Sequence, residues 1–569
     1  MPNPPHREKE NAMEWLNQYS RAFLAKGYLT EGVDPEERIR SIALQAEKIL
    51  KKTDFAEKFT DYMARGYYSL SSPIWSNFGT EKGLPISCFG GHLSDSMSSI
   101  LYAQAEAGMM SKFGGGTSGY FGDLRHRGAP IRMNGESSGA VHFMQLFETI
   151  VNVVSQGSTR RGHFAPYLPI EHPDIGEFLE IGTEGNLIQN LTHGVTVSDS
   201  WMQSMVGGDQ EKRALWAKVI QRRVEIGYPY IVFTDTVNRN TVDVYKDKGL
   251  RITHSNLCSE IALPDNDDWS FVCDLSSMNL LHYDQWKETD AVETLIFFLD
   301  AVMTDFIVKL EALRDSPNRH DREAFHYMKR THAFARQNRA LGLGVLGWHS
   351  YLQSRMIPLE SKEARQINLE IFRVIRERSL KASEDLAREY GEPELLKGYG
   401  RRNTTLNAVA PTTSSAFILG QVSQSIEPIW SNCYVKDIDK MKVTIHNPAL
   451  KKILHEKGLD TREVWNTIRD HDGSVQHLEI LSDQEKRVFK TFSEINPLEI
   501  IDQAAARQHF IDQSQSLNLM VNPLMSAREI NHLYITAWKL GIKSLYYQHS
   551  TNAAQTFSRN KLCETACEA

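Results

Sequence analysis

Three polar side chains that could act on one substrate lie within residues 254–260, which read His-Ser-Asn-Leu-Cys-Ser-Glu. Side chains of an extended segment alternate between its two faces, so Asn256, Cys258 and Glu260 are predicted to point the same way. This row would offer an amide for hydrogen bonding, a sulfur able to carry a thiolate or a radical, and a carboxylate able to act as a general base. A core strand with a buried cysteine is the other interpretation, because free cysteine is among the most buried residue types.

The other cysteines favour a redox role. Six cysteines in 569 residues do not describe a disulfide-stapled secreted domain. Cys563 and Cys567 lie at the end of the chain, where a mobile dithiol could reach a buried disulfide and exchange with it. Half of a zinc site is the alternative, but no further ligands follow at a fixed spacing, and no metal site is predicted in this chain. Cys433 is expected to be a packing residue.

The composition excludes several classes of protein. The chain has 64 basic and 71 acidic residues, and its net charge of -7 argues against a general binder of nucleic acid or anionic membranes. We find neither an apolar signal segment nor a run of about eighteen apolar residues that could span a membrane. With 41% hydrophobic residues, we expect a soluble protein with a sizeable core, in a reducing compartment such as the cytoplasm.

Helical and extended patterns alternate along the chain and favour the α/β class. Residues 73–135 are rich in glycine and serine with little long periodicity, and tight turns or loops are predicted at 114–116 and 128–130. Residues 339–345 are predicted to be structural, with glycines for close packing. Residues 434–500 are strongly charged and predict a peripheral helical insertion, and residues 551–569 predict a polar tail. Helices are predicted over 1–70, 140–157, 197–226, 293–313, 362–390 and 528–541, and strands over 229–233, 271–274, 404–410 and 542–547.

Five separated motifs resemble those of the large, catalytic subunit of class I ribonucleotide reductases, over about residues 65–569. That family has a finger loop with a radical-forming cysteine, two strands with a redox pair of cysteines, a tyrosine pair that passes the radical inward, and a shuttle dithiol. The resemblance implies a ten-stranded α/β barrel with a central finger loop, preceded by a helical N-terminal region. The matching segments are 256–264 for the finger loop, Ser87-Cys88 with 91–96 and 271–275 for the redox strands, 544–548 for the tyrosines, and Cys563 with Cys567 for the shuttle.

The reaction that the resemblance implies is the reduction of ribonucleoside diphosphates to 2′-deoxyribonucleotides. Hydroxide is a poor leaving group, and a radical at the 3′ carbon weakens the adjacent bond. Cys258 would take the 3′ hydrogen as a thiyl radical, and Glu260 would accept the 3′-hydroxyl proton as general base. Asn256 would fix the substrate by hydrogen bonds.

The remaining cysteines would supply the electrons. The resemblance implies that Cys88 and Cys273 protonate the departing hydroxyl and provide two electrons, ending as a disulfide. Cys563 and Cys567 would then reduce that disulfide by exchange, with thioredoxin or glutaredoxin as the external reductant.

Tyr546 and Tyr547 are adjacent, and in most strands one member of such a pair is in the core and the other on the surface. The resemblance implies instead a relay of stacked phenols that carries a radical from a metal-containing small (beta) subunit to Cys258. No cofactor would then be bound covalently in this chain. One alternative is an adenosylcobalamin-dependent reductase, which makes its radical locally and generally lacks the pair. Another is a catalytically silent nucleotide-binding paralogue.

Substrate phosphates have a candidate site after the predicted strand that ends at residue 410. Small hydroxyl residues that follow a strand and open a helix can present donors to an anion, although a Ser/Thr helix cap is the alternative. The resemblance adds Ser72 and Ser87, which match family positions that contact the substrate. The predicted substrate-binding residues are Asn256, Ser72, Ser87, Pro411, Thr412, Thr413, Ser414 and Ser415.

Allosteric control by dNTP or ATP effectors follows from a match to the family's specificity pocket, which lies at a homodimer interface. Residues 156–162 match the loop that connects effector and substrate, with an exposed basic turn as the alternative. The predicted effector-binding residues are Asp95, Ser96, Met97, Arg125, Ile131, Gln156 and Arg160.

The resemblance implies three regions. Residues 1–70 would form a helical N-terminal region, too short for the ATP cone with which many class I large subunits begin. Residues 71–550 would form the catalytic barrel, with the charged insertion near 434–500. Residues 551–569 would form a flexible redox tail.

Overall fold

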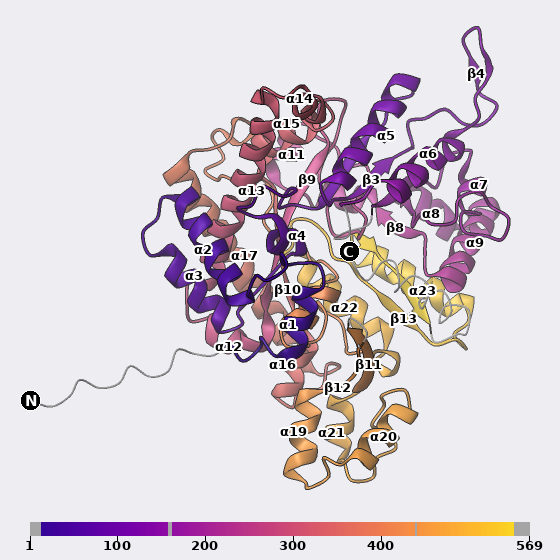
Figure 1. The fold of residues 1–569 in the computed structure, drawn as a ribbon. Coiled ribbons are helices and arrows are strands. Elements are labelled where there is room, and N and C mark those ends of the chain that lie inside the picture. The colour runs from indigo at the N-terminus through magenta and orange to yellow at the C-terminus, as the bar shows by residue number, and fades with distance from the viewer. Residues whose placement is uncertain (1–12, 157–161, 439–440, 551–569) are drawn as a thin grey trace, which may run out of the picture.

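A computed structural model describes residues 13–156, 162–438 and 441–550 of the chain. It begins with three helices, α1 (Gln18–Ala25), α2 (Pro35–Leu50) and α3 (Phe55–Ala64), that pack against the side of a barrel (Figure 1). Helix α2 is capped by the Asp34 side chain and has proline at its first position, which fits the start of a helix. Its buried positions recur at helical spacing and are Ile39, Ile42, Ala43, Ala46 and Leu50.

The predicted helical N-terminal region is therefore observed, with one difference at its end. Residues Tyr68–Leu70 form a short strand, β1, that pairs antiparallel with β9 (Phe271–Asn279). All three of its residues are buried, so β1 extends the edge of the barrel sheet.

Five parallel strands form the first half of the barrel, and their order in space is their order in the chain. Parallel neighbours need crossover connections, and helices such as α6 (Ala140–Val153) and α9 (Gln210–Ile226) supply them on the outer side (Figure 1). The strands are β2 (Cys88–His92), β3 (Gly116–Tyr120), β6 (His163–Pro169), β7 (Gly194–Val197) and β8 (Tyr230–Phe233).

Five further segments form the second half, again parallel to one another. Strand β9 pairs with β10 (Leu341–Leu346), and single bridges continue the ring from Leu343 to Asn407 and from Val409 to Gln515. The last neighbours in the ring are β13 (Leu519–Val521) and β15 (Gln548–Ser550). The two halves meet at two antiparallel junctions, where β2 pairs with β9 and β8 pairs with β14 (Ser544–Leu545). The ten segments close a ring, which confirms the predicted ten-stranded α/β barrel.

The strand predicted over 404–410 was wrong in detail. Within this segment the structure has only the single bridges at Asn407 and Val409. The Asp512 carboxylate accepts the backbone N–H groups of Leu406 and Asn407, both at 2.9 Å. Because these amides are used by a side chain, a regular ladder of strand hydrogen bonds cannot form there.

The region 73–135, in which the sequence shows little long periodicity, contains the long helix α5 (Met97–Lys112), which is capped by Ser96. Small residues interrupt the apolar spacing of α5, so its sequence gives a weak helical pattern. The remaining helices of the barrel are α4 (Ser72–Asn77), α7 (Ile175–Phe178), α8 (Asp199–Gly207), α10 (Thr234–Arg239), α11 (Asp243–Asp247), α12 (Tyr283–Trp286), α13 (Ala291–Asp315), α14 (Arg319–His326), α15 (Lys329–Asn338), α16 (Trp348–Ser354), α17 (Lys362–Tyr390), α18 (Thr413–Ile418), α22 (Pro497–Gln508) and α23 (Ala527–Lys539).

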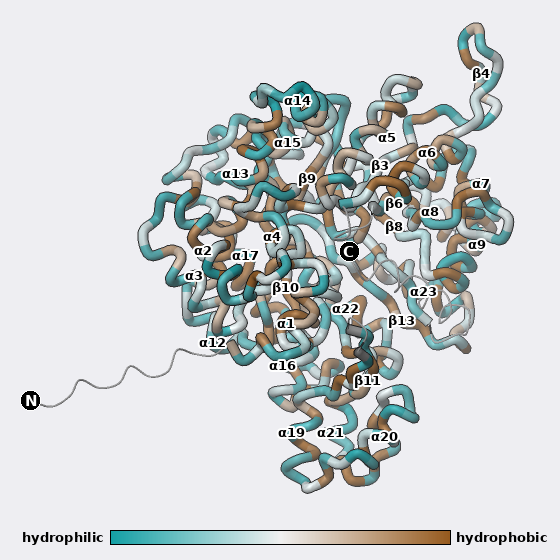
Figure 2. The backbone as a smooth tube through the Cα atoms, in the orientation of Figure 1, coloured by the Kyte–Doolittle hydropathy of each residue, from teal (hydrophilic) through white to brown (hydrophobic). Residues whose placement is uncertain are grey.

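A separate lobe projects from the barrel where the charged helical insertion was predicted (Figures 1 and 2). It opens with a hairpin of β11 (Cys433–Ile438) and β12 (Met441–His446), which the helical prediction missed. Its hydrophobic core is distinct from that of the barrel and includes Cys433, Trp465 and Phe489. Its helices are α19 (Pro448–Glu456), α20 (Arg462–Asp470) and α21 (Asp483–Val488). Among the helices of the described residues, none is long and apolar enough to cross a membrane.

Candidate active site

The finger loop, residues 251–264, joins the two halves of the barrel by hydrogen bonds to both. Tyr167 of β6 donates its hydroxyl to the carbonyl oxygen of Asn256 at 2.6 Å. Ser516 and Ser544 of the second half donate to two further carbonyl oxygens of the loop at 2.5 and 2.8 Å. These bonds satisfy the polar backbone of a buried loop and fix its position.

The tip of the finger loop is a tight turn, so the predicted extended row was wrong. The Ser259 N–H faces the carbonyl oxygen of Asn256 at 3.4 Å, and Ser259 adopts a left-handed conformation with φ 67°. The turn nevertheless brings the predicted groups together, because the side chains of Asn256 and Glu260 are hydrogen-bonded to each other. Cys258 stands at the apex between them.

Glu260 has the surroundings of a general base. Its side chain is 1% exposed, and burial raises the pKa of Glu260 to about 7, while hydrogen bonds from Asn256 and Ser516 oppose the rise. The Ser516 hydroxyl donates to the carboxylate at 3.2 Å. A carboxyl group with a pKa near neutrality can both take up and return a proton at physiological pH.

Cys88 and Cys273 face each other across the β2–β9 junction as directly paired residues. Directly opposed residues of antiparallel strands have Cα atoms about 4.5–5.5 Å apart, within the range of disulfides. Both are thiols in this structure. Cys88 is half-buried, whereas Cys273 is 1% exposed. Gly342 of β10 makes room for this sulfur, since a Cβ atom there would lie 3.1 Å from Cys273 Sγ.

Tyr546 and Tyr547 directly follow β14 at the second junction, and Tyr546 contacts the finger loop. The Tyr546 phenol is hydrogen-bonded to the Cys258 thiol, and the two tyrosine rings lie 4.5 Å apart in an edge arrangement. Tyr546 is buried and Tyr547 is half-buried, so neither is a fully exposed surface residue. Burial raises the pKa of both phenols above the usual value, so both are protonated at neutral pH.

Several residues at the site were missed by sequence reasoning. The ring of Tyr230 lies 4.8 Å from that of Tyr546 and 5.2 Å from that of Tyr547. The Gln513 amide donates to Cys273 Sγ at 3.2 Å, and Ser516 contacts Glu260. Tyr230 was predicted only as part of a strand, and the Asp-Gln-Ser-Gln-Ser sequence at 512–516 carries no spacing that marks its function.

The predicted phosphate-binding residues open helix α18, as expected. Thr412 adopts a left-handed conformation before the helix, and its hydroxyl accepts the Ser425 N–H at 2.8 Å. Thr413 donates its hydroxyl to Gln424 at 3.2 Å. Helix α18 packs on β1, which leads directly to Ser72 at the start of α4. Pro411, Ser415, Ser72 and Ser87 are half-buried, and Ser414 is buried.

The predicted effector residues fall at both ends of α5. At its N-terminal end, Asp95 accepts the Arg125 backbone and side-chain N–H groups at 3.2 and 2.8 Å. Arg125 also donates to the carbonyl oxygen of Pro130, next to Ile131 in β4 (Pro130–Ile131), and Met97 is 56% exposed. Gln156 lies at the other end of α5, whose 16 residues span about 24 Å at 1.5 Å per residue. There the Gln156 side chain donates to Asn77 of α4 at 3.1 Å.

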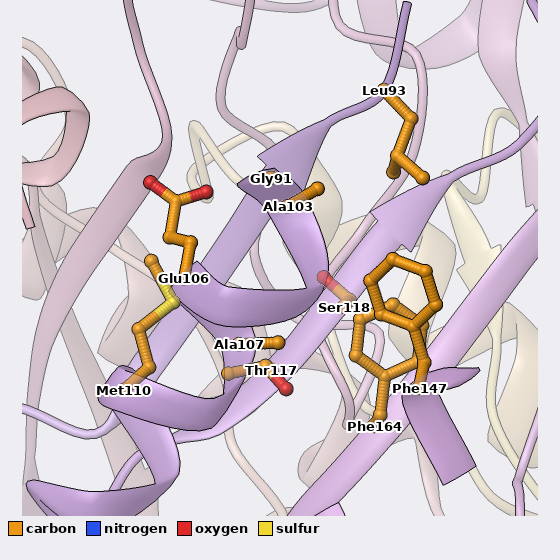
Figure 3. Close-up of a pocket in the computed structure, with 10 residues that line it drawn as sticks. All are labelled: Gly91, Leu93, Ala103, Glu106, Ala107, Met110, Thr117, Ser118, Phe147 and Phe164. Carbon is orange, nitrogen blue, oxygen red and sulfur yellow. The ribbon is translucent and has the colours of Figure 1, made fainter. Parts of the chain in front are cut away.

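Helix α5 itself is closely packed on the barrel (Figure 3). A cavity of about 10 Å³ lies among α5, β2, β3, β6 and α6, which is room for about one water molecule and too little for a nucleotide. Glu106 of α5 forms a buried ion pair with Arg330 and accepts the Ser270 hydroxyl at 2.9 Å. Helix α5 is thereby tied to the chain segment that enters β9.

Some predictions lie outside the described residues, namely those for Arg160, Cys563 and Cys567. Within the described residues, no group of three or more His, Cys, Asp or Glu side chains is placed to hold a metal ion.

Comparison with protein families gives two matches that together cover most of the chain. The ribonucleotide reductase all-alpha domain matches residues 14–83, where no ATP cone was expected. The ribonucleotide reductase barrel domain matches residues 86–211, 208–395 and 393–548.

Individual relatives agree with the family matches. The structure of a class Id ribonucleotide reductase alpha subunit from Actinobacillus ureae superposes with a TM-score of 0.89 at 54% identity, covering 96% of this chain and 99% of that one. A ribonucleoside-diphosphate reductase large subunit of Invertebrate iridescent virus 3 is 33% identical over 594 residues, covering 91% of this chain and 90% of the relative. The corresponding large subunit of Danio rerio is 30% identical over 614 residues, covering 93% of this chain and 75% of the relative. The chain therefore belongs to the ribonucleotide reductase family, as the large, catalytic subunit of a class I ribonucleoside-diphosphate reductase.

Proposed function

We propose that this chain reduces ribonucleoside diphosphates by a thiyl radical on Cys258, with the Cys88 and Cys273 thiols as the source of two electrons. One observation carries the proposal: the thiol of Cys258, at the tip of the finger loop, is hydrogen-bonded to Tyr546, and the same loop tip carries Asn256 and Glu260. A radical route, a general base and a hydrogen-bonding amide then meet at one sulfur.

The first steps belong to the finger loop. With a radical on its sulfur, Cys258 removes the 3′ hydrogen of the ribose. Glu260 takes the 3′-hydroxyl proton, which a carboxyl with a pKa of about 7 accepts at neutral pH. Asn256, hydrogen-bonded to this carboxylate, holds it toward the substrate.

The reducing step belongs to the β2–β9 junction. One thiol of the pair protonates the departing 2′-hydroxyl, which leaves as water. Cys88 and Cys273 together give up two electrons and two protons and form a disulfide. One of these protons leaves in the water and the other becomes the new hydrogen on the 2′ carbon, while Glu260 returns its proton to the 3′ oxygen. Cys258 finally returns the hydrogen to the 3′ carbon and regains its radical. The direct pairing of the two cysteines supports this assignment, since no movement of the strands is needed to join their sulfurs.

The substrate is proposed to lie between the finger loop and α18. The relatives are named as ribonucleoside-diphosphate reductases, and a diphosphate needs several N–H and O–H donors near the ribose site. The residues at 411–415 would supply backbone N–H groups and hydroxyls, and Ser72 and Ser87 would add two further hydroxyls.

The radical is proposed to come from a small subunit that holds the metal centre. The aromatic contacts from Tyr547 through Tyr546 to Cys258 support an inward route, and Tyr547 is half-buried while Tyr546 is buried. Thioredoxin or glutaredoxin acting through the Cys563 and Cys567 dithiol is the proposed source of electrons, which fits the cytoplasm.

Regulation is proposed to occur at a homodimer interface on α5. Met97 and Leu101 are 56% and 48% exposed on this helix, and a partner subunit would cover such apolar side chains. A dNTP or ATP effector near Asp95 and Arg125 would bind at the same surface and favour the dimer by linkage.

Substitution of Cys258 by serine tests the proposal. Deoxynucleotide formation by Cys258→Ser, assayed with its small subunit and dithiothreitol, is expected to fall to background, while nucleotide binding by calorimetry stays unchanged. Cys433→Ser is the matched control, because Cys433 packs in the separate lobe. Turnover by a clean Cys258→Ser preparation would remove this thiol from the mechanism.

A further inference from the structure

We infer that the Cys88–Cys273 disulfide is reduced with one fixed polarity: a dithiol attacks Cys88, and Cys273 leaves as a thiolate held by Gln513. The inference rests on the proposed role of the two cysteines as the redox pair. Gln513 acts on the reaction through Cys273 and is therefore a positioning residue.

The orientation of the Gln513 amide is fixed by its contacts. Its Oε1 accepts the N–H of Ala262 in the finger loop at 3.0 Å, so Nε2 must face the other way. There the two N–H groups of Nε2 are shared among three acceptors, which are Cys273 Sγ at 3.2 Å, the Leu341 carbonyl at 3.0 Å and the Thr405 hydroxyl at 3.1 Å. The side chain is fully buried. The donor is thus held on the sulfur by partners in three other segments.

This donor favours the thiolate form of Cys273. Burial raises the pKa of the Cys273 thiol well above its usual value, and the hydrogen bond from Gln513 opposes that rise. Hydrogen bonds to charged groups are stronger than those between neutral groups. In thiol–disulfide exchange, the sulfur whose thiolate is more stable leaves faster. The amide therefore offsets part of the cost of placing a thiolate on buried Cys273, which lets this sulfur leave.

Access favours the same polarity. The attacking thiolate approaches the disulfide along the S–S axis, from the side away from the leaving sulfur. On the far side of Cys273 lies β10, where Gly342 is so close that a Cβ atom would contact Cys273 Sγ and Leu275. The neighbour of Cys88 on its far side is Gly116 of β3, which packs against Leu257 of the finger loop. The two sulfurs differ in exposure, because Cys88 is half-buried whereas Cys273 is 1% exposed.

The exchange conserves atoms and electrons. A thiolate of the dithiol forms a bond to Cys88 Sγ, the Cys88–Cys273 bond breaks, and its electron pair stays on Cys273 as a thiolate beside the Gln513 amide. The second thiolate of the dithiol attacks the mixed disulfide at its own first sulfur, and Cys88 leaves as a thiolate. Two protons return both cysteines to thiols, and the dithiol ends oxidised.

Mapping of the mixed disulfide tests the polarity without any change at Gln513. The full chain with Cys563→Ser and Cys567→Ser is oxidised by diamide, treated briefly with 2-mercaptoethanol and alkylated with iodoacetamide. Peptide mass spectrometry is expected to find mercaptoethanol on Cys88 and the alkyl group on Cys273, in at least a tenfold excess over the reverse. An equal or reversed distribution would overturn the inference. Because diamide forms the disulfide without substrate, the result stands apart from whether the chain reduces ribonucleotides.

A conservative variant tests Gln513 itself. Gln513→Glu keeps an oxygen for the Ala262 N–H but loses the N–H that faces sulfur. Its disulfide is expected to be reduced by dithiothreitol about tenfold more slowly at pH 8, with a steeper pH dependence and unchanged substrate KM. Gln515→Glu is the matched control, since Gln515 is also buried in this segment but bonds to Arg507 and Ala504. Equal rates in the two variants would exclude Gln513 from this role.

Discussion

The two junctions between the half-barrels have the same backbone geometry and different contents. At each one, a strand of the first half pairs antiparallel with a strand of the second, β2 with β9 and β8 with β14. The first junction places two sulfurs opposite each other, and glycines at 90, 91, 116 and 342 let neighbouring groups pack close to it, while Cys88 stays half-buried. The second is filled with aromatic rings, those of Tyr230, Tyr546 and Tyr547.

This difference matches two kinds of proposed electron movement. A disulfide forms and exchanges only if its sulfurs can be reached by another thiol, which requires open space on one side. A relay of phenols requires contact between the rings and does not require access by another thiol. The finger loop lies between the junctions and places Cys258 against the tyrosines and Glu260 toward the cysteines, since Glu260 also raises the pKa of Cys273.

Removal of one phenol should give the largest effect, because it breaks the aromatic junction alone. Tyr546→Phe keeps the ring packing but has no phenolic proton to lose, so we expect turnover to fall at least about a thousandfold. Chemical formation of the Cys88–Cys273 disulfide should be unchanged. Tyr228→Phe is the control, because the Tyr228 ring centroid lies 6.0 Å from that of Tyr547 and Tyr228 takes no part in the Tyr546–Cys258 contact. Near-normal steady-state rates in Tyr546→Phe would mean that the pair is only packing.

Loss of one sulfur should break the other junction alone. With Cys273→Ser, no disulfide can form, and we expect deoxynucleotide formation to fall about a hundredfold or more below wild type. Radical transfer to Cys258 should persist, so incubation with substrate and the small subunit should still consume its radical, as followed by electron paramagnetic resonance. A radical that survives unchanged in Cys273→Ser would contradict the separation of the two junctions.

The dithiol of Cys563 and Cys567 should affect only the re-reduction of the Cys88–Cys273 disulfide at the first junction. We expect Cys563→Ser with Cys567→Ser to lose thioredoxin-dependent turnover by about tenfold or more, and dithiothreitol to restore part of it, because a small dithiol reaches half-buried Cys88 directly. Assays with each reductant measure this. An unchanged thioredoxin-dependent rate would show that these cysteines are not the shuttle.

The smallest effect concerns the loop between the junctions. Burial raises the folded-state pKa of Glu260 to about 7, from 4.5, so folding favours the protonated form. The stability contribution of this proton is fully present below pH 4.5 and is lost as the pH rises through 7. Glu260→Gln should therefore melt about 1 to 3 °C above wild type at pH 8, with the gap closing toward pH 5. Equal melting temperatures at pH 8 would show that the ionised carboxylate carries no penalty.

The resemblance predicted the barrel, and it placed Cys88 and Cys273 as neighbours, because each lies within a local motif. Cys258 and Glu260 stand two residues apart, and Cys88 and Cys273 each lie in a recognisable strand. The turn at Ser259 was missed, because a left-handed serine is imposed by hydrogen bonds from Ser516 and Ser544, far away in the chain. Gln513 and Tyr230 were missed for the same reason, since their partners are long-range contacts that no local spacing reveals.

The β8–β14 junction also bears on how the chain reaches its folded state. Arg223, in the helix that leads to β8, donates to the carbonyl oxygen of Tyr546 across 323 residues of sequence. The ring of strands cannot close before the chain is synthesised nearly to its end, and until then β8 is an open sheet edge able to pair with another chain. Contacts of such separation make folding slow. Truncation or delay near residue 545 should therefore produce aggregation, and the aromatic contact to Cys258 should be among the last to form.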